Sequence, residues 1–229
     1  MKVTALIPVK GFHNAKQRLS AFLGSAEREA LAEAMFRDVL RQVRQARGLH
    51  ETVVVTGDDK VAAIAASLGA RVMLENAETG ETAAVDFART SLKNAGCEAV
   101  LIIPGDMPLV RSADIELVLA QIPAGQLAPF ALLVPSHDRL GTNALLLAPP
   151  DIIKLRFGYD SFSYHLSQVS AQGLPVRSVD NEHIALDIDD PNDLKRFLAH
   201  SAEHTESLEI LRRFIADQRS QPSRRVGEA

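Results

Sequence analysis

The sequence predicts an α/β protein in which helices cover both faces of a parallel sheet. Short apolar runs alternate with amphipathic helical segments along the chain, and one run, at 99–103, is apolar at every position. Alternating strands and helices are typical of parallel β-α-β units with right-handed crossovers. A strand that is covered on both faces has no polar side, so we expect residues 99–103 at the centre of the sheet.

The individual elements follow from local periodicity. Apolar and β-branched runs predict strands at 3–7, 52–56, 71–74, 99–103, 131–134, 143–147 and, at an edge, 175–178. Helical patterns lie at 26–47, 58–68, 81–94, 113–121, 161–172, 193–199 and 203–218. In the first helix an apolar stripe runs at i, i+4 spacing from Leu31 to Val43, with Ser25 as the expected N-cap and Gly48 as the residue just past the end.

The composition is that of one folded domain. The chain has 229 residues, 46% hydrophobic and 24% charged, with a net charge of −4. Such a balance offers no basic field to a nucleic-acid backbone, so we expect small-molecule partners. One cysteine, Cys97, allows no internal disulfide and fits a reducing cytoplasm. No apolar run reaches the ~18–20 residues that cross a bilayer, and Pro8 and Lys10 interrupt any signal-peptide core, so we expect no membrane contact.

The loop after the first predicted strand, residues 8–19, gathers cations. Lys10, Lys16 and Arg18 lie in it, and Pro8 and Gly11 flank Lys10. Polyphosphates commonly bind where a first strand ends, because backbone N–H groups and cations can both point at the ligand there. The glycine patterns of Walker and Rossmann loops are absent. Taken alone, the loop is equally compatible with a solvated basic turn.

A second candidate site follows the central strand, where Gly105 and Asp106 precede Pro108. An aspartate at the carboxyl end of a central parallel strand faces the crevice in which α/β sheets bind ligands. Mg²⁺ takes oxygen ligands and needs only one or two carboxylates beside the phosphates of a substrate. We therefore consider Asp106 as a metal ligand; the alternative is that it only stabilises a turn.

A pair of carboxylates lies further along the chain. Asp187 and Asp189 alternate along an extended segment, so both point to the same side, where they repel unless a cation or solvent separates them. Asp190 and Pro191 then begin a helix, with proline at its favoured first position. Capping accounts for Asp190, but Asp187 lies too far upstream, so a metal ligand is the better interpretation of Asp187.

A third group of segments is suited to an anion. Gly141 and Gly158 permit close approach of the backbone to a ligand. Thr142 and Ser161 can donate hydroxyl and amide hydrogens to a phosphate or carboxylate, and Ser161 lies at a helix start. A plain β-turn at Gly141 and a plain N-cap at Ser161 are equally open.

The loop that opens the helix at 81–94 is a weaker candidate. Backbone groups around Gly80 could hold a nucleobase, or Thr79 or Thr82 could simply satisfy the first amides of the helix. Near the candidate loops lie His13, His137, His165 and His183, which show no metal-ligand spacing and are expected to be surface or satisfied residues.

In this order the motifs resemble the guanylyltransferases of deazaflavin coenzyme F-420 biosynthesis, which use 2-phospho-L-lactate, phosphoenolpyruvate or 3-phosphoglycerate. The segments that carry the resemblance are 8–11, 15–19, 105–109, 141–145, 157–161 and 186–189. The resemblance implies a three-layer α/β/α, Rossmann-like nucleotidyltransferase fold with a mostly parallel, mixed sheet at residues 1–200. A C-terminal helix and a tail rich in Ser, Arg and Pro, expected to be disordered, then occupy 201–229.

The resemblance also implies a reaction and its residues. GTP would be the donor, a small phosphorylated three-carbon acid the acceptor and pyrophosphate the product, with two Mg²⁺ ions. The implied residues are, for catalysis, Lys10, Lys16, Arg18 and Asp106; for metal, Asp106, Asp187 and Asp189; for GTP, Pro8, Lys10, Gly11, Lys16, Gly80 and Thr82; and for the acceptor, Thr142, Gly158 and Ser161. One departure is Glu81-Thr82, where the family often has Leu-Asn. Implied partners are small molecules and a downstream F-420 transferase, and a homodimer is considered.

Two other functions compete with this one. Another nucleotidyltransferase could charge a molybdopterin or a sugar phosphate, although the segments around Thr142 and Ser161 favour a small phospho-acid. A nucleotide-binding regulator without catalysis is the alternative from a different class. A regulator needs no second carboxylate pair, so Asp187 and Asp189 argue against it.

Overall fold

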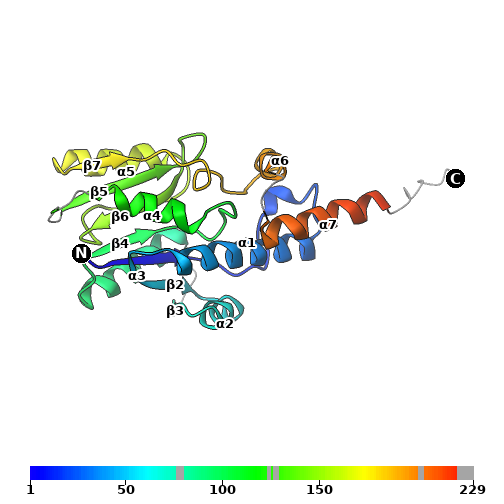
Figure 1. Ribbon diagram of the computed structural model, residues 1–229, viewed down its shortest axis with the longest axis horizontal. Helices are drawn as coiled ribbons and strands as arrows, with labels where there is room; N and C mark the ends of the chain where they lie inside the picture. Colours follow the sequence, from blue (N-terminus) through cyan, green and yellow to red (C-terminus); the bar gives the residue numbers. More distant parts are fainter. Residues whose placement is uncertain (76–79, 123–124, 126–128, 201–203, 221–229) are drawn as a thin grey trace.

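A seven-stranded sheet with the order β3-β2-β1-β4-β6-β5-β7 organises the chain in the computed structural model (Figure 1). The structure describes residues 1–75, 80–122, 125, 129–200 and 204–220. The strands are β1 Val3–Pro8, β2 Leu49–Thr56, β3 Arg71–Leu74, β4 Ala99–Ile102, β5 Phe130–Pro135, β6 Thr142–Ala148 and β7 Val176–Ser178. The predicted strands are confirmed, and β4, predicted to be central, is the fourth of the seven.

The helices also follow the sequence pattern closely. They are α1 Ser25–Gln45, α2 Asp59–Ser67, α3 Glu81–Asn94, α4 Ser112–Ala120, α5 Ser161–Ala171, α6 Pro191–Ala199 and α7 Glu206–Ser220, with a short 3-10 helix at Gln17–Leu19. The expected N-cap at Ser25 is wrong by one residue: Gly24 is the cap, and its N–H donates to the Glu27 carboxylate at 2.7 Å. The start of the last helix, expected at 203, lies at Glu206; residues 201–203 and the tail at 221–229 are outside the described residues.

One strand of the sheet runs against the others. β6 is antiparallel to both of its neighbours, β4 and β5, whereas β1, β2, β3 and β4 pair in parallel. The reason is the short connection from β5, because residues 136–141 cannot hold a crossover helix and form a hairpin loop instead. As a result the first residue of β6, Thr142, lies at the same sheet edge as the carboxyl ends of β1 and β4.

Alternation along the strands divides the core into two apolar clusters. In β1, Val3, Ala5 and Ile7 pack into the cluster that includes side chains of α1, α2 and α4, while Leu6 faces the cluster formed with α3 and α5. The sheet is thus covered on both faces, which confirms the three-layer α/β/α arrangement (Figure 1). Within the part of the chain that the structure describes, no helix is long and apolar enough to cross a membrane.

A third apolar cluster joins α6 and α7 to the far side of α1. Leu186 and Ile188 are buried in it, so Asp187 and Asp189, which alternate with them, are turned toward the opposite side. This cluster therefore sets the direction of the two aspartates. It confirms that both carboxylates face one side of the segment.

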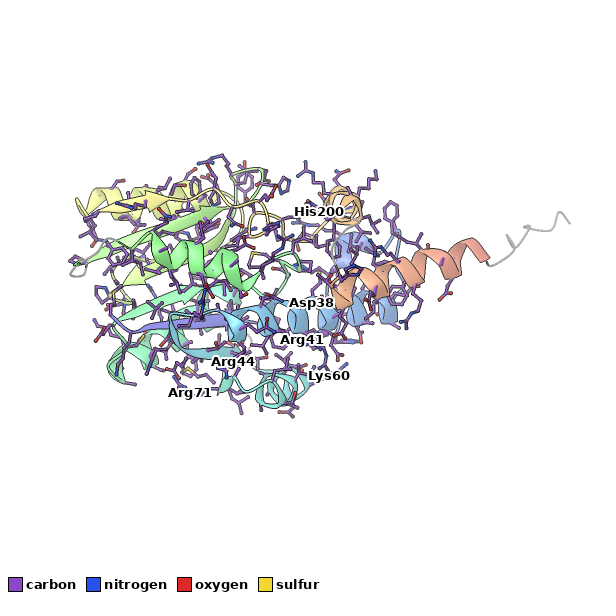
Figure 2. All side chains as sticks on the ribbon, in the orientation of Figure 1. Asp38, Arg41, Arg44, Lys60, Arg71 and His200 are labelled. Atoms are coloured by element: carbon purple, nitrogen blue, oxygen red, sulfur yellow. The ribbon has the colours of Figure 1, made fainter. Side chains whose placement is uncertain are left out.

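The start of α7 is held by a carboxylate of α1 (Figure 2). The buried side chain of Asp38 accepts hydrogen bonds from the backbone N–H groups of Glu206 and Ser207 at 3.0 and 2.9 Å, and from the Ser207 hydroxyl at 2.6 Å. Amides in the first turn of a helix have no hydrogen-bond partner within the helix. Asp38, which lies on another helix, accepts hydrogen bonds from these amides in place of an N-cap side chain.

We expect Asp38→Ala to loosen α7 from α1. The loss of a capping acceptor costs about 1 kcal/mol, and amide hydrogen exchange in α7 should accelerate. Urea denaturation and hydrogen–deuterium exchange measure the two effects. Asp38→Asn is the matched control, because its amide oxygen still accepts from the helix start, and it should lie between wild type and Asp38→Ala. Unchanged exchange in α7 of Asp38→Ala would contradict the capping role.

Candidate active site

The carboxyl edge of β1 and β4 opens into a cleft of about 1090 Å³. The loop after β1, the turn after β4, the start of β6 and the segment before α6 all contribute to it. The first turn of α3 closes one side, through Glu81 and Ala84. Ligands of α/β proteins bind at this edge, where the strands end and the loops diverge.

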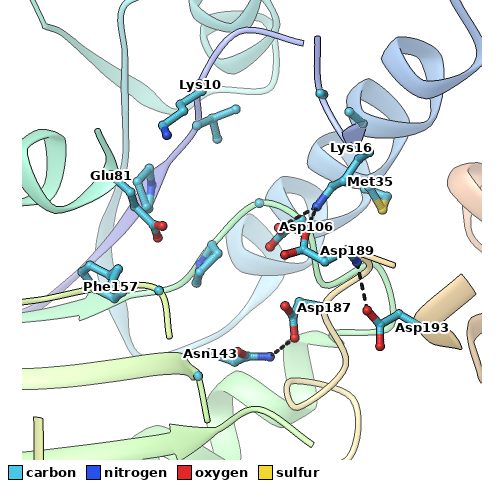
Figure 3. A pocket seen from close by; sticks show the side chains of 18 of the residues that line it. Lys10, Lys16, Met35, Glu81, Asp106, Asn143, Phe157, Asp187, Asp189 and Asp193 are labelled. Atoms are coloured by element: carbon cyan, nitrogen blue, oxygen red, sulfur yellow. Dashed lines mark hydrogen bonds and ion pairs between the residues drawn. The ribbon is translucent and has the colours of Figure 1, made fainter. Parts of the chain in front are cut away.

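Lys16 points into the cleft and bonds to the carboxylates of Asp106 and Asp189 (Figure 3). Its Nζ lies 2.8 Å from Asp106 Oδ2 and 2.9 Å from Asp189 Oδ1, and its side chain is only 10% exposed. Burial by itself lowers the pKa of this ammonium, but the two carboxylates outweigh burial and raise the pKa above its ordinary value. Lys16 is therefore charged, and it ties together three segments that are far apart in the sequence.

The backbone of Lys16 is in the left-handed region, with φ 51°. Few residues other than glycine adopt this conformation without a reason, and here it starts the 3-10 helix that follows. Buried Arg28 steadies the loop by donating to the carbonyl oxygens of Ala15 and Leu23, at 3.3 and 2.8 Å. The loop is thus built to aim one cation inward.

The two other cations of the loop remain accessible. Arg18 is 75% exposed and lies 4.0 Å from Asp189 Oδ2. Lys10 is exposed and lines the cleft on the side of Glu81, away from Lys16 (Figure 3). Both cations can meet a ligand that enters the cleft, whereas Lys16 already has partners.

Carboxylates outnumber the buried cation. Burial and the nearby Asp106 raise the pKa of Asp187 to about 6, even though Asn143 Nδ2 donates to its carboxylate at 3.0 Å. Burial and Asp106 likewise raise the pKa of Glu81 to about 7. By contrast Lys16 lowers the pKa of Asp189. The cleft has an excess of negative charge that a cation would relieve.

The aspartates fit a hard divalent cation by their chemistry. Asp106, Asp187 and Asp189 all line the cleft and offer carboxylate oxygens, which Mg²⁺ prefers. Among the described residues, however, no three His, Cys, Asp or Glu side chains form a preassembled metal cluster. The reason is visible in Figure 3, where Lys16 bonds to Asp106 and Asp189 while Asp187 turns to Asn143.

The expected anion site differs in two respects from the sequence prediction. The amide of Thr142 donates to Ser161 Oγ at 2.9 Å, and the amide of Ser161 donates to the Gly158 carbonyl at 3.1 Å. Neither amide can therefore serve a ligand; only the two hydroxyl hydrogens remain. Ser161 is also not the N-cap of α5, because that position belongs to Asp160. Gly158 has φ 98°, a conformation that favours glycine.

The structure brings most of the predicted site residues to this one cleft. Those that line it are Pro8, Lys10, Gly11, Lys16, Arg18, Asp106, Thr142, Gly158, Ser161, Asp187 and Asp189. Gly80 and Thr82 are not among the described residues that line the cleft. Thr82 Oγ1 instead accepts a hydrogen bond from the Phe157 amide at 3.1 Å. Thr79 lies outside the described residues. The GTP roles of Gly80 and Thr82 stay predictions.

Two polar residues of the site, Asn143 and Glu81, were missed from the sequence, and His165 was expected only to be a surface or satisfied residue. Asn143 bonds to Asp187, Glu81 places a carboxylate in the cleft, and His165 bonds to Thr142. His165 could have been found, because it follows Ser161 at i+4 on a predicted helix and so shares its face. Asn143 could not, since its partner is 44 positions away.

Gly11 brings its loop unusually close to α2. A Cβ at this position would lie 2.6 Å from Asp58 Oδ2. The same carboxylate caps α2, because Asp58 Oδ1 accepts from the Val61 amide at 2.9 Å. A methyl group at position 11 would therefore have to displace the Asp58 side chain.

Solved structures with similar folds include nucleotidyltransferases. A protein of Desulfovibrio desulfuricans described as a nucleotide-diphospho-sugar transferase superposes with a TM-score of 0.77 at 18% identity, covering 96% of this chain and 98% of that one. A cytidylyltransferase of Leptospira borgpetersenii gives a TM-score of 0.63 at 16% identity, covering 97% and 96%. The chain has the nucleotidyltransferase fold.

Sequence comparison then gives the family. The family described as "Guanylyl transferase CofC like" matches residues 3–226, and the chain belongs to it. Phosphoenolpyruvate guanylyltransferase of Conexibacter woesei is 35% identical over 85% of this chain and 86% of its own length. The 2-phospho-L-lactate enzyme of Methanothermobacter thermautotrophicus is 33% identical over 93% and 91%. The 3-phospho-D-glycerate enzyme of Colwellia psychrerythraea is 33% identical over 92% and 98%.

We expect Gly11→Ala to destabilise the protein by about 1 kcal/mol, because the new methyl group displaces the Asp58 carboxylate from the α2 amides. Urea denaturation of Gly11→Ala, Asp58→Ala and the double variant measures the effect. Since both single changes remove the same cap, the double variant should be no less stable than Asp58→Ala alone. Additive losses would show that the Gly11 methyl group clashes with something other than this carboxylate.

Proposed function

We propose that this protein transfers GMP from GTP to a small phosphorylated three-carbon acid and releases pyrophosphate. The observation that carries the proposal is the composition of the cleft at the carboxyl edge of the sheet. Cations of the first loop, a set of aspartates and a pair of donor hydroxyls line it together. Membership of the CofC-like family and the guanylyltransferase names of the relatives support the same reaction.

The chemistry follows from charge. A phosphate oxygen of the acceptor attacks the α-phosphorus of GTP, the bond to the β-phosphate oxygen breaks, and pyrophosphate leaves. Lys10, Lys16 and Arg18 offset the charge of the triphosphate and of the departing pyrophosphate, because fixed cations stabilise charge that develops in the transition state. No general base is required, since the attacking phosphate oxygen is already ionised at neutral pH.

Asp106, Asp187 and Asp189 would hold Mg²⁺, and we propose two ions. Bound there, Mg²⁺ would supply the positive charge that brings the phosphates of donor and acceptor together. The shared position of these carboxylates in the cleft, and the raised pKa that burial and the nearby Asp106 give to Asp187, support this assignment.

At the far side of the cleft, Thr142, Gly158 and Ser161 receive the acceptor acid. The hydroxyl groups of Thr142 and Ser161 are the donors, and Gly158 lets the backbone come close to the ligand. Relatives named for three different acids have 33–35% identity to this chain, so overall identity does not choose among the acids. We propose that GTP occupies the side of the cleft formed by Pro8, Lys10, Gly11 and Lys16, with Gly80 and Thr82 near the guanine.

The reaction also suggests a cellular setting. We propose that the chain acts in the cytoplasm, as a homodimer, in the biosynthesis of deazaflavin coenzyme F-420. Its product joins two phosphates through an energy-rich phosphoanhydride bond, so we propose that a second transferase consumes it.

Pyrophosphate release tests the proposal directly. The protein is incubated with Mg²⁺, GTP and, in turn, phosphoenolpyruvate, 2-phospho-L-lactate or 3-phosphoglycerate, with ATP and CTP as donor controls. We expect release with GTP and at least one of the acids. Release only with a sugar phosphate or a molybdopterin would point to another nucleotidyltransferase. GTP binding without release for every acceptor would favour a regulator.

We expect Asp106→Asn to lower turnover by about 10²–10³-fold while the fold is retained, because the charge that neutralises Mg²⁺ and Lys16 is lost. Steady-state pyrophosphate release and thermal denaturation measure the two outcomes. Asp180→Asn, which changes an 80% exposed carboxylate paired with Arg139, is the matched control and should leave turnover unchanged. Near-normal turnover of Asp106→Asn would exclude Asp106 from the metal site.

A further inference from the structure

We propose that His165 is a positioning residue that turns the Thr142 hydroxyl hydrogen into the cleft, toward the acceptor. This inference deepens the proposed function and rests on it. The amides of Thr142 and Ser161 are both occupied, so these two residues can offer a ligand only their hydroxyl hydrogens, and the direction of each O–H bond decides whether that hydroxyl attracts or repels an anion.

The ring of His165 has its proton position fixed by its two neighbours. Nε2 lies 3.2 Å from the backbone N–H of Arg156, and Nδ1 lies 3.0 Å from Thr142 Oγ1. A backbone N–H can only donate, so Nε2 must be an unprotonated acceptor. The hydrogen of the neutral ring is then on Nδ1 and points at Thr142.

The consequence falls on the Thr142 hydroxyl. Because Oγ1 accepts the hydrogen bond from His165 Nδ1, its own hydrogen is free to point elsewhere, and Thr142 lines the cleft. The Ser161 hydroxyl is likewise an acceptor within the protein, since its Oγ accepts a hydrogen bond from the Thr142 amide, and its own hydrogen is free to point elsewhere. Both hydroxyls thus present hydrogens to a phosphate or carboxylate, which can only accept.

The opposite tautomer would reverse this arrangement. With the hydrogen on Nε2, the Thr142 hydroxyl would donate to Nδ1 and turn a lone pair toward the anion. The Arg156 amide would also lose its partner. One backbone N–H, outside the cleft lining, therefore selects the polarity of a hydroxyl inside it.

The surroundings of His165 keep the ring uncharged and restrict its rotation. It is fully buried, and the rings of Phe157 and Tyr164 pack edge-on against it at 5.3 and 5.7 Å. Burial, followed by the nearby cations Arg156 and Arg89, lowers the pKa of His165 to about 4. A protonated ring would need an acceptor at Nε2, where the Arg156 amide stands.

Two substitutions separate the two hydrogen bonds of the ring. The side-chain amide of Asn ends at the δ position, so His165→Asn can still donate to Thr142 but does not reach the Arg156 amide. The amide of Gln ends one atom further, so His165→Gln can accept from Arg156 but offers no donor to Thr142. His50→Gln, an exposed position on β2, is the matched surface control.

The kinetic readout is the KM for the acceptor against the KM for GTP. We expect the acceptor KM of His165→Gln to exceed that of His165→Asn by about tenfold, the scale of one hydrogen bond to a charged group, with similar GTP KM values. In a Thr142→Val background, which has no hydroxyl to orient, the two His165 variants should not differ. Equal acceptor KM values for Asn and Gln in the wild-type background would overturn the proposal.

A second readout does not depend on activity. Nitrogen-15 NMR of the imidazole rings, assigned by the loss of one signal set in His165→Gln, should show His165 with its hydrogen on Nδ1 in the free protein. A hydrogen on Nε2 would overturn the proposal, whatever the kinetics. If the wild type transfers GMP to no acid, the proposed function fails, and the tautomer still decides whether Thr142 is presented as a donor.

Discussion

The ion pairs of Lys16 with Asp106 and Asp189 are the constraint on which the cleft depends. They join the loop after β1, the turn after β4 and the segment before α6 through one buried ammonium. Without that ammonium, Asp106, Asp187 and Asp189 would face one another across a partly buried space, and like charges there repel strongly. We attribute the left-handed backbone conformation of Lys16 to its ion pairs with both carboxylates.

This pairing has a consequence for substrate binding. In the free cleft, Lys16 and the aspartates neutralise one another, and a triphosphate must compete with carboxylates for the ammonium. A divalent cation that arrives with the nucleotide would compete in turn for the carboxylates. Each exchange frees the group that the other one needs, so donor and metal are expected to bind better together than either does alone.

Much of the fold and of the cleft was readable from the sequence, because both depend on local pattern and on strand order. Residues 99–103 were placed centrally by apolarity, and the alternation of 186–189 correctly set Asp187 and Asp189 on one side. The antiparallel direction of β6 is also encoded, in a connection too short for a helix. Hydrogen bonds between residues distant in the sequence could not be predicted. Nothing in the sequence near Thr142 indicates that its amide donates to the Ser161 hydroxyl.

The backbone shows where local rules give way to the site. Among the described residues, the non-glycine positions with positive φ are Asn14, Lys16, Arg139 and Asp160. Asn14 and Lys16 line the cleft themselves, while Arg139 and Asp160 each lie between two residues that line it. Such conformations cost free energy and persist only when surrounding contacts enforce them. Their confinement to these loops indicates that the loops are shaped for the cleft, at some cost in stability, while the sheet and helices obey their propensities.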